Sequence, residues 1–325
     1  MSNNFDTAIL IPTANRLQII KRTIQNYSRS TNPPVLYIGD SSNKQDIEEL
    51  ESFIKFHQFN FVKLFYLPKY NVGNVLIYLS KQLDSKIAYV CFHGDDDFIF
   101  AENLELFKKG LDEDSSITSV QGYAITIEIL YQNEKVHLGA FGDYWKKPSR
   151  LEAEVENRLI NHSKNYFVAA FSLKRKQDLL PCVSGFTKFR FKESDLWQEY
   201  LESFATISLG KSIFLPIPYL IRGVHNARKL TVSGSEVNSL AYKNGKEVFV
   251  KQMASYLNLP KHEKFLFVEQ LVENLLKKNS NKQKLRYFKK FIPMNIRFYL
   301  KILRFRKTIY SKMAHDYFQL VKHLD

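Results

Sequence analysis

The sequence predicts an α/β fold with a mostly parallel central sheet, followed by a strongly basic helical extension at the C-terminal end. Apolar, strand-like segments at residues 7–11, 35–39, 61–67 and 87–92 alternate with helix-like segments within the first hundred residues. Polar clusters follow the ends of these strands. Excess positive charge is concentrated in the last quarter of the chain.

Each of the first three strands is followed by a segment with helical spacing. The first of these segments places apolar residues on one helical face, namely Leu17, Ile20, Ile24 and Tyr27. Similar spacing predicts helices around residues 47–54 and 75–83. Strand–helix repeats of this length suit right-handed parallel crossovers, so we expect helices on both faces of the sheet.

The fourth strand ends in an unusual acidic sequence. Residues 87–92 form an apolar run, and after His93 and Gly94 come three consecutive aspartates, Asp95, Asp96 and Asp97. Crowded carboxylates repel one another, so we expect a cation beside them. Oxygen ligands suit a hard ion such as Mg²⁺ or Mn²⁺, which would in turn neutralise phosphate oxygens. The alternative is a solvated acidic loop after a strand.

Several other polar side chains follow strand ends in the same way. They are Asn15, Arg16, Asp40, Ser41 and Asn71. Because the carboxyl ends of parallel strands meet at one edge of a sheet, these residues and the aspartates should converge there. Ligands of open α/β sheets bind in that crevice. The sequence therefore predicts a ligand site at this edge.

The second half of the chain gives weaker signals. Residues 123–131 and 135–141 alternate as the two strands of a hairpin, and residues 212–221 form a strand. Pro216 and Pro218 lie within that last strand, so we expect it at a sheet edge or leaving the sheet. We also expect a helix over residues 150–161 and a strand over residues 166–171.

Composition limits the compartment and the domain organisation. The two cysteines, Cys91 and Cys182, give no disulfide framework and no metal-ligand spacing. The first residues carry no secretory signal pattern, and the longest apolar runs are shorter than a membrane span. We therefore expect a cytoplasmic protein with one domain over residues 5–232 and a basic helical region over residues 233–325.

The net charge of +14 resides almost wholly in that C-terminal region. Residues 243–325 contain 19 Lys and Arg against 6 Asp and Glu, and residues 274–312 contain thirteen cations and no acid. Two opposite helical arcs are expected there, an apolar one with Phe298, Ile302, Phe305 and Ile309, and a basic one with Arg297, Lys301 and Arg304.

This separation is typical of a helix that lies in a membrane interface. It predicts peripheral attachment to an anionic membrane surface, on the inner face of the cell membrane. Two alternatives remain: binding of nucleic acid, with the aromatic residues stacking on bases, and a packed helical subdomain with a solvated basic face. The separation of the two arcs favours lipid over nucleic acid.

Taken together, four strand-end motifs resemble those of the family-2-like glycosyltransferases of the GT-A fold, of the bacterial surface-glycan type. The motifs are residues 9–16 (ILIPTANR), 39–42 (GDSS), 71–73 (NVG) and 94–97 (GDDD). The resemblance covers roughly residues 5–130 and weakens towards residue 232. It implies a GT-A fold and a nucleotide-sugar donor.

The resemblance also implies a donor site. The base and ribose pocket would be lined by Pro12, Thr13, Asn15 and Arg16, with Asp40 and Ser41 on the base or ribose. Among the donor-binding residues the resemblance also places Asn71, Asp95 and Asp96. The ligands of Mg²⁺ or Mn²⁺ would be Asp95, Asp97 and His225, with Arg228 as a phosphate partner.

For catalysis, the resemblance implies an acidic residue near the start of a later helix that deprotonates the acceptor hydroxyl. Asp195 is the preferred base and Glu193 the alternate. Ser41 stands where the family has a glycine, which leaves the donor open. The Gln-x-x-Arg-Trp signature of processive synthases is absent, which favours transfer of a single sugar.

The resulting hypothesis is a metal-dependent inverting glycosyltransferase that moves a single sugar from a nucleotide-sugar donor to a hydroxyl of a surface-glycan or lipid-linked acceptor. One alternative is a non-catalytic protein that binds nucleic acid or membranes through its basic helices. The other is a sugar-nucleotide pyrophosphorylase. Residues 12–16 contain no glycine, which disfavours that class, because its first loop is rich in glycine.

Overall fold

The computed structural model describes residues 6–132, 135–141, 148–189, 195–225 and 240–290. Its contacts divide the chain into two units, Met1–Leu271 and Val272–Asp325. The boundary falls within α10 (Lys261–Lys290), so α9 (Leu240–Ser255) belongs to the first unit. The sequence predicts the division after residue 232.

The first unit contains a five-stranded sheet in the order β3-β2-β1-β4-β8. Its strands are β1 (Thr7–Thr13), β2 (Val35–Asp40), β3 (Val62–Tyr66), β4 (Tyr89–Phe92) and β8 (Lys174–Arg175). The first four strands pair in parallel, and β8 pairs antiparallel with β4. The predicted mostly parallel sheet is therefore confirmed.

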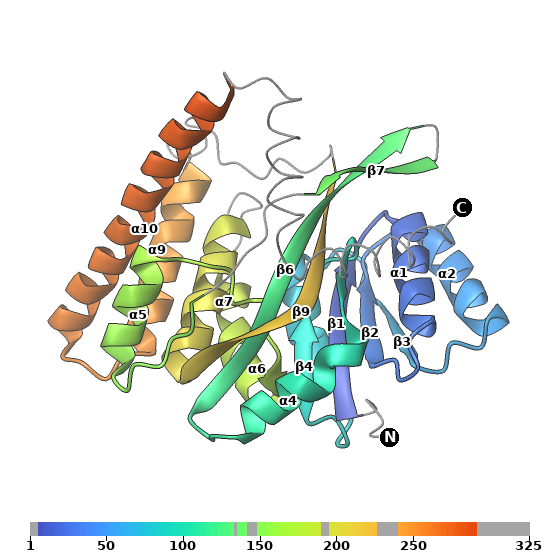
Figure 1. The fold of residues 1–325 in the computed structure, drawn as a ribbon, viewed down its shortest axis with the longest axis horizontal. Helices are drawn as coiled ribbons and strands as arrows, with labels where there is room; N and C mark the ends of the chain where they lie inside the picture. Colours follow the sequence, from blue (N-terminus) through green and yellow to red (C-terminus); the bar gives the residue numbers. More distant parts are fainter. Residues whose placement is uncertain (1–5, 133–134, 142–147, 190–194, 226–239, 291–325) are drawn as a thin grey trace. The chain divides into compact units, whose positions relative to one another are not determined.

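Helices connect these strands where the sequence predicted them: α1 (Leu17–Ser28), α2 (Lys44–Phe56) and α3 (Val72–Lys81). The side chains of Asn43 and Asn71 cap α2 and α3 by accepting hydrogen bonds from backbone amides three residues later, at 2.9 and 2.8 Å. Figure 1 shows α1 and α2 on one side of the sheet, with α6 (Lys176–Val183) and α7 (Asp195–Leu209) on the other.

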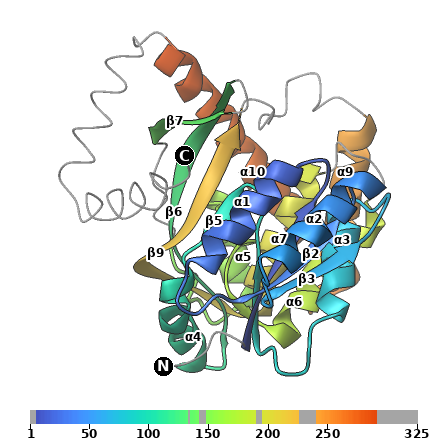
Figure 2. The same ribbon diagram turned by 90° about the vertical axis from the view of Figure 1, so that its right-hand side faces the viewer.

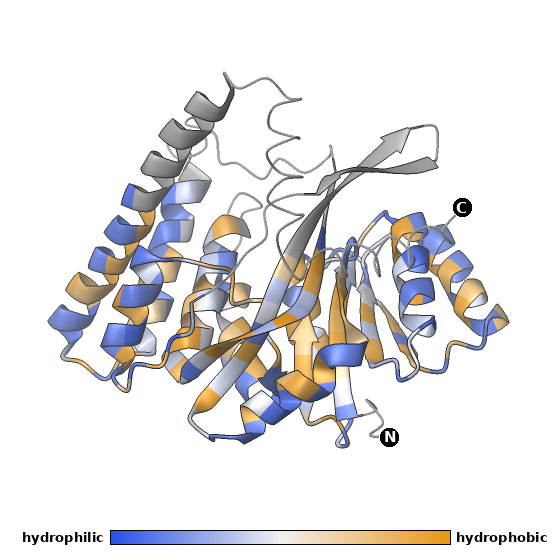
Figure 3. Cartoon of the chain, viewed as in Figure 1, coloured by the Kyte–Doolittle hydropathy of each residue, from blue (hydrophilic) through white to orange (hydrophobic). Residues whose placement is uncertain are grey.

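Burial of the sheet explains its continuous apolar strands. Ile9, Leu10 and Ile11 of β1 have no exposed surface, and β4 is mostly apolar in Figure 3. A parallel strand covered by helices on both faces needs apolar side chains in both directions, so its sequence does not alternate. This arrangement leaves the polar residues at the strand ends.

A second sheet has the order β5-β9-β6-β7. Its strands are β5 (Asp97–Ile99), β6 (Ile117–Gln132), β7 (Lys135–Phe141) and β9 (Lys211–His225). β6 and β7 form the predicted antiparallel hairpin, while β6 and β9 run parallel side by side (Figure 2). Because β5 begins at Asp97 and pairs with β9, it fixes the end of the acidic segment against the second sheet.

The edge position expected for residues 212–221 is wrong, because β9 lies between β5 and β6. Pro216 and Pro218 are accommodated by an irregularity instead. The register between β6 and β9 shifts between the pairs Gln121↔Phe214 and Tyr123↔Pro218, and β5 pairs with β9 only beyond the prolines. The missing proline N–H groups therefore interrupt no regular ladder on that side.

Two expectations between residues 150 and 171 are also corrected. The helix begins later than predicted, as α5 (Val155–Lys164), because Arg150 instead forms a β-bridge with Ser212. Residues 166–171 form no strand. The backbone carbonyls of Ala169 and Ala170 point to the ammonium group of Lys174, at 3.4 and 3.1 Å, which curls the segment.

Aromatic side chains pack helix α7 against α9. Trp197 has no exposed surface and packs against Tyr242 and Phe249 of α9, with ring centroids 5.2 and 5.3 Å apart. Phe249 also meets Phe204 edge-on. This packing fixes the apolar face of α7, so the opposite face of the helix, which carries polar residues, faces the end of the parallel sheet.

The C-terminal residues 291–325, with the apolar and basic arcs expected around Phe298 and Arg297, lie outside the described residues. Within the described part of the chain, no helix is long and apolar enough to span a membrane.

Candidate active site

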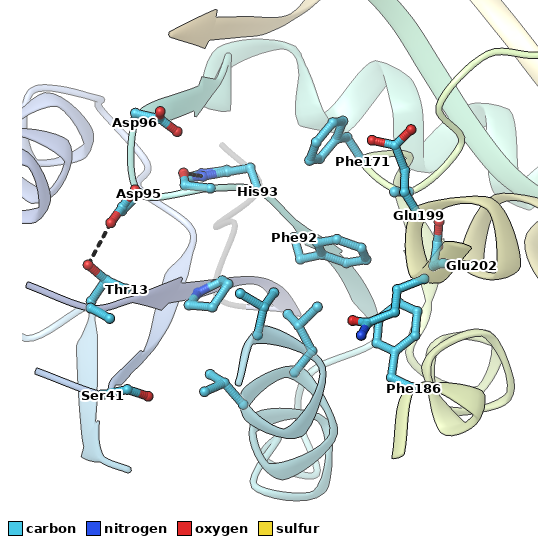
Figure 4. A pocket seen from close by; sticks show the side chains of 18 of the residues that line it. Thr13, Ser41, Phe92, His93, Asp95, Asp96, Phe171, Phe186, Glu199 and Glu202 are labelled. Carbon is cyan, nitrogen blue, oxygen red and sulfur yellow. Dashed lines mark hydrogen bonds between the residues drawn. The ribbon is translucent and has the colours of Figure 1, made fainter. Parts of the chain in front are cut away.

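A pocket of about 600 Å³ lies at the carboxyl ends of β1, β2 and β4. One wall, the strand-end wall, is formed by Thr13, Arg16, Ser41, Asp95 and Asp96. The opposite wall, the α7 wall, is formed by Gln198, Glu199 and Glu202 of α7 with Phe171 and Phe186, as Figure 4 shows for most of these residues. The volume of the pocket is in the range of small-molecule binding sites.

Asp95 is the centre of the strand-end wall. Its Oδ2 accepts a hydrogen bond from the Thr13 hydroxyl at 2.7 Å, and its Oδ1 accepts one from Arg16 Nη1 at 2.8 Å. The Thr23 hydroxyl donates to the Asp95 carbonyl at 2.6 Å. Residues from β1 and α1, with the N-cap Arg16, are thereby joined at Asp95, which follows the end of β4.

Burial and the neighbouring charges act in opposite directions on Asp95. Desolvation raises the pKa of its carboxyl, while the hydrogen bond from Thr13 and the charge of Arg16 lower it in part. Arg16 Nη1 also lies 3.7 Å from Asp96 Oδ2. One arginine therefore lies beside two adjacent carboxylates.

His93 fixes the turn that precedes the aspartates. Its Nδ1 lies 2.6 Å from the Gly94 carbonyl oxygen, which only accepts, so Nδ1 donates and Nε2 accepts from the Tyr27 hydroxyl at 2.8 Å. The Tyr27 oxygen accepts in turn from the amide of Ile99 at 2.9 Å. Burial lowers the pKa of His93 to about 4, so its ring is neutral at pH 7.

The second strand contributes a hydroxyl group to the pocket. Asp40 is buried, and its Oδ1 accepts from the amide of Ser42 at 2.7 Å, which shapes the turn after β2. Asn15 supports the same turn, because its backbone N–H donates a hydrogen bond to Ser42 Oγ at 2.6 Å. Ser41 Oγ lines the pocket and has no hydrogen-bond partner among the described residues. It therefore has its hydrogen-bonding capacity left for a ligand.

Four of the predicted site residues support the pocket from outside its lining. They are Asn15, Asp40, Asn71 and Asp97, whereas Pro12, Thr13, Arg16, Ser41, Asp95 and Asp96 line it. Asp97 is buried, and its two oxygens accept from the amides of Gly223 at 3.1 Å and Gly94 at 3.4 Å. Asn71 is used as the cap of α3.

The chemistry of the carboxylates suits a hard divalent ion. No group of three His, Cys, Asp or Glu side chains that could hold a metal is formed by the residues the structure describes. Mg²⁺ typically needs only one or two carboxylates, because water and substrate phosphates complete its shell. Asp95 and Asp96, both at the pocket, supply oxygen donors of this kind.

The remaining predicted residues are described in part or not at all. Asp195 is the first residue of α7 and His225 the last of β9, and only their backbones are described. Glu193 and Arg228 lie outside the described residues. The roles of all four stay predictions.

The α7 wall is the part of the site that the sequence reasoning missed. Its polar side chains Gln198, Glu199 and Glu202 recur at helical spacing on the face of α7 opposite Trp197, and Thr206 continues the stripe. The Tyr166 hydroxyl donates to Glu199 Oε1 at 3.0 Å. This polar stripe is the signal by which the wall could have been found.

No protein-family model and no curated protein matches the chain significantly. Solved structures do. S. aureus TarS residues 1–349 aligns with a TM-score of 0.54 and 13% identity, over 89% of this chain and 76% of that one. The same TarS fragment in complex with UDP-GlcNAc gives a TM-score of 0.51 and 15% identity, over 89% and 77%.

A longer TarS structure aligns with a TM-score of 0.50 and 14% identity, over 83% of this chain. The chain spans less than half of its length, 43%. TarS is a glycosyltransferase of the GT-A type. The chain therefore has the GT-A glycosyltransferase fold that its strand-end motifs led us to expect.

Proposed function

We propose that the chain is an inverting glycosyltransferase that moves a single sugar from a nucleotide-sugar donor to a hydroxyl of a surface-glycan or lipid-linked acceptor. One observation carries the proposal. In a GT-A fold, Arg16, Ser41, Asp95 and Asp96 follow three strand ends, those of β1, β2 and β4, and converge in one pocket of about 600 Å³.

The strand-end wall supplies what a nucleoside diphosphate needs. Pro12 and Thr13 line the pocket where the base and ribose would lie, and Ser41 Oγ offers a hydroxyl for a hydrogen bond. Arg16 is a third exposed, at 34% of its side chain, so it can move from Asp95 to a phosphate oxygen. Asn15, Asp40 and Asn71 would keep this wall in shape.

For the metal, we propose Asp95, Asp97 and His225 as ligands of Mg²⁺ or Mn²⁺, with Asp96 beside them at the pocket. Such an ion would neutralise the negative charge on the departing diphosphate. Arg228 would add a further positive charge. Arg16, which lies 2.8 Å from Asp95, already holds the acidic segment in place.

The acceptor would be activated by Asp195, with Glu193 as the alternate. Asp195 begins the helix whose next turns line the pocket at Gln198 and Glu199. A carboxylate placed opposite the leaving group takes the acceptor proton, which gives direct displacement with inversion. Because an aspartate is a weak base in water, its contribution would come from position.

Binding of donors to the purified full chain tests this proposal. A thermal-shift screen with UDP, GDP, CMP and dTDP sugars, each with and without Mn²⁺, should show one donor class that raises Tm, because a ligand stabilises the state that it binds. UDP-GlcNAc is the first donor to test, since the TarS fragment of the same fold was solved with it.

Transfer is then measured as nucleotide release with lipid-linked or oligosaccharide acceptors. Asp195→Asn should bind the donor and release no nucleotide, whereas Glu51→Gln, an exposed change on α2, should behave like the wild type. The proposal is contradicted if no nucleotide sugar shifts Tm, or if Asp195→Asn and Glu193→Gln together keep full turnover.

We further propose that the basic region anchors the protein on an anionic membrane surface, which fits a lipid-linked acceptor. Thirteen cations and no acid lie within residues 274–312. Co-sedimentation with anionic vesicles should be strong for the full chain and lost on removal of residues 283–325. Equal binding of both forms, or binding of the full chain to single-stranded DNA alone, would contradict the membrane role.

A further inference from the structure

The α7 wall contains a buried ion pair that the proposed mechanism does not use. Glu202 Oε1 lies 3.0 Å from Lys174 Nζ, and neither side chain has any exposed surface. The Thr206 hydroxyl donates to the same oxygen at 2.9 Å. Two donors from different elements therefore hold one oxygen of this carboxylate.

Lys174 is itself fixed by several acceptors. Besides Glu202, its Nζ contacts the carbonyl oxygens of Ala169, Ala170 and Ser172 at 3.4, 3.1 and 3.3 Å, and Ser172 Oγ at 3.1 Å. An ammonium group with this many acceptors has little freedom to move. The orientation of the Glu202 carboxylate is therefore set before any ligand arrives.

The other oxygen of Glu202 differs from the first. Oε2 is buried and has no hydrogen-bond partner among the described residues, although Glu202 lines the pocket. A buried carboxylate oxygen without a donor is costly, because it has lost its hydration. Because Glu202 lines the pocket, a ligand held there is an available source of the missing hydrogen-bond donor.

The surroundings define that ligand group. Phe92, Phe171 and Phe186 line the pocket near Glu202, and Figure 4 shows Glu202 across the pocket from Ser41 and Asp95. The strand-end wall is occupied by the nucleotide in the proposed function, so the group that reaches Glu202 belongs to the other end of the donor. That end of a nucleotide sugar carries hydroxyl groups, each of which can donate.

We propose that Glu202 Oε2 accepts a hydrogen bond from a hydroxyl of the transferred sugar, and that the Lys174–Glu202 pair thereby selects the donor sugar. This inference rests on the proposed function. Glu202 lines the pocket opposite the strand-end wall, so the sugar end of a bound donor would lie on its side of the pocket.

The first test is the affinity of Glu202→Gln for two ligands. Calorimetry should show binding of the nucleotide sugar weakened about 10-fold or more, the usual effect of losing a hydrogen bond to a charged group, and binding of the matching nucleoside diphosphate changed less than about 2-fold. Glu51→Gln, an exposed glutamate, is the matched control and should change neither affinity.

The second test uses donors that lack one sugar hydroxyl. The wild type should lose affinity for one deoxy sugar in particular, and Glu202→Gln should no longer distinguish that analogue from the intact donor, because contacting groups do not act additively. Glu202→Asp keeps a negative charge near Lys174, but its shorter side chain moves the carboxylate oxygen away from the pocket. This variant replaces Glu202→Gln in the same measurements if Glu202→Gln does not fold, and it should weaken binding of the nucleotide sugar in the same way.

Other outcomes overturn the inference. Equal weakening of diphosphate and nucleotide sugar, additive losses for every deoxy sugar, or an effect confined to the KM of the acceptor would each exclude the contact with the transferred sugar. In those cases the wild type still binds a nucleotide sugar, so the proposed function stands. If the wild type binds none, the proposed function fails and the inference fails with it.

Discussion

The two walls of the pocket each carry a carboxylate paired with a cation, but they differ in access to water. In the strand-end wall, Arg16 pairs with Asp95 at 2.8 Å and has 34% of its side chain exposed. In the α7 wall, Lys174 pairs with Glu202 at 3.0 Å and both side chains are wholly buried. The same chemistry therefore has different consequences for stability and for binding.

Exposure determines what each pair can do. Arg16 has a third of its side chain in solvent and can turn towards a ligand, although its partner Asp95 is buried. A buried pair is different, because removal of one partner leaves an uncompensated charge. The strand-end wall can adapt to its ligand, whereas the α7 wall is fixed in advance.

The largest expected effect comes from breaking the buried pair. Lys174→Met should lower the free energy of unfolding by about 3–5 kcal/mol, because Glu202 would then be a buried charge without a cation. Urea unfolding followed by circular dichroism measures the change.

The control for this change is the double variant Lys174→Met with Glu202→Leu. Since both charges are removed, its stability should recover most of the loss seen in Lys174→Met alone. If the double variant is less stable than the single one by the full cost of a second substitution, the two residues do not act as a pair, and the contrast between the walls is lost.

A second prediction concerns the packing of α3 against the α7 wall. A Cβ added to Gly73 of α3 would lie 2.7 Å from Cβ of Phe186. Phe186 lies in the 3₁₀ helix η3 (Ser184–Lys188) and lines the pocket. Neither Cβ can rotate away, so Gly73→Ala should cost about 1–3 kcal/mol of unfolding free energy. This cost is the net loss that remains after the gain of up to about 1 kcal/mol from replacing a helical glycine.

Gly110→Ala in α4 (Leu104–Asp112) is the matched control. There the nearest atom would be Ile213 Cδ1 at 3.1 Å, the end of a flexible side chain that can move. Thermal unfolding should therefore show a clear loss for Gly73→Ala and little change for Gly110→Ala. Equal effects of the two substitutions would mean that α3 is not tightly packed against Phe186 of the α7 wall.

These two regions also differ in how far the sequence predicted them. The strand-end wall depends on local patterns, namely apolar runs that stop at Thr13, Asp40 and Phe92, and on the rule that parallel strands end at one edge. These signals identify Arg16 and Asp95 as candidate site residues from the sequence alone.

The α7 wall depends on contacts that no local pattern records. Lys174 meets Glu202 only because residues 166–171 curl, and an apolar run of that length is equally consistent with a strand. The error in that segment and the missed glutamate have the same cause, since the carbonyl groups that would pair in a strand bind Lys174 instead. Only the polar stripe of α7 was visible in the sequence.

A third prediction tests the adaptable wall. Arg16→Ala should lower the free energy of unfolding less than Lys174→Met does, because the buried Asp95 keeps the hydrogen bond from the Thr13 hydroxyl. Its affinity for a nucleoside diphosphate should nevertheless fall about 10-fold or more, since a charged hydrogen bond to phosphate is lost. Calorimetry and thermal unfolding of the same samples separate the two effects. A large loss of stability with unchanged affinity would reverse the roles given to the two walls.

The smallest expected effect concerns the two free cysteines, both of which are buried. Burial raises the pKa of both thiols, Cys91 in β4 and Cys182 in α6, from 9.0 to about 12. At pH 8 neither should form the thiolate that attacks a disulfide reagent, so the folded protein should react only as it opens.

The two thiols can also report which wall opens. Cys182 lies 3.4 Å from the Thr206 hydroxyl, which holds Glu202, whereas Cys91 lies in the central sheet. Lys174→Met should therefore make Cys182 react earlier than Cys91, as mass spectrometry of partly labelled protein would show. Simultaneous labelling of both thiols would mean that the α7 wall opens only with the whole domain, and that its rigidity comes from the sheet instead of from the buried pair.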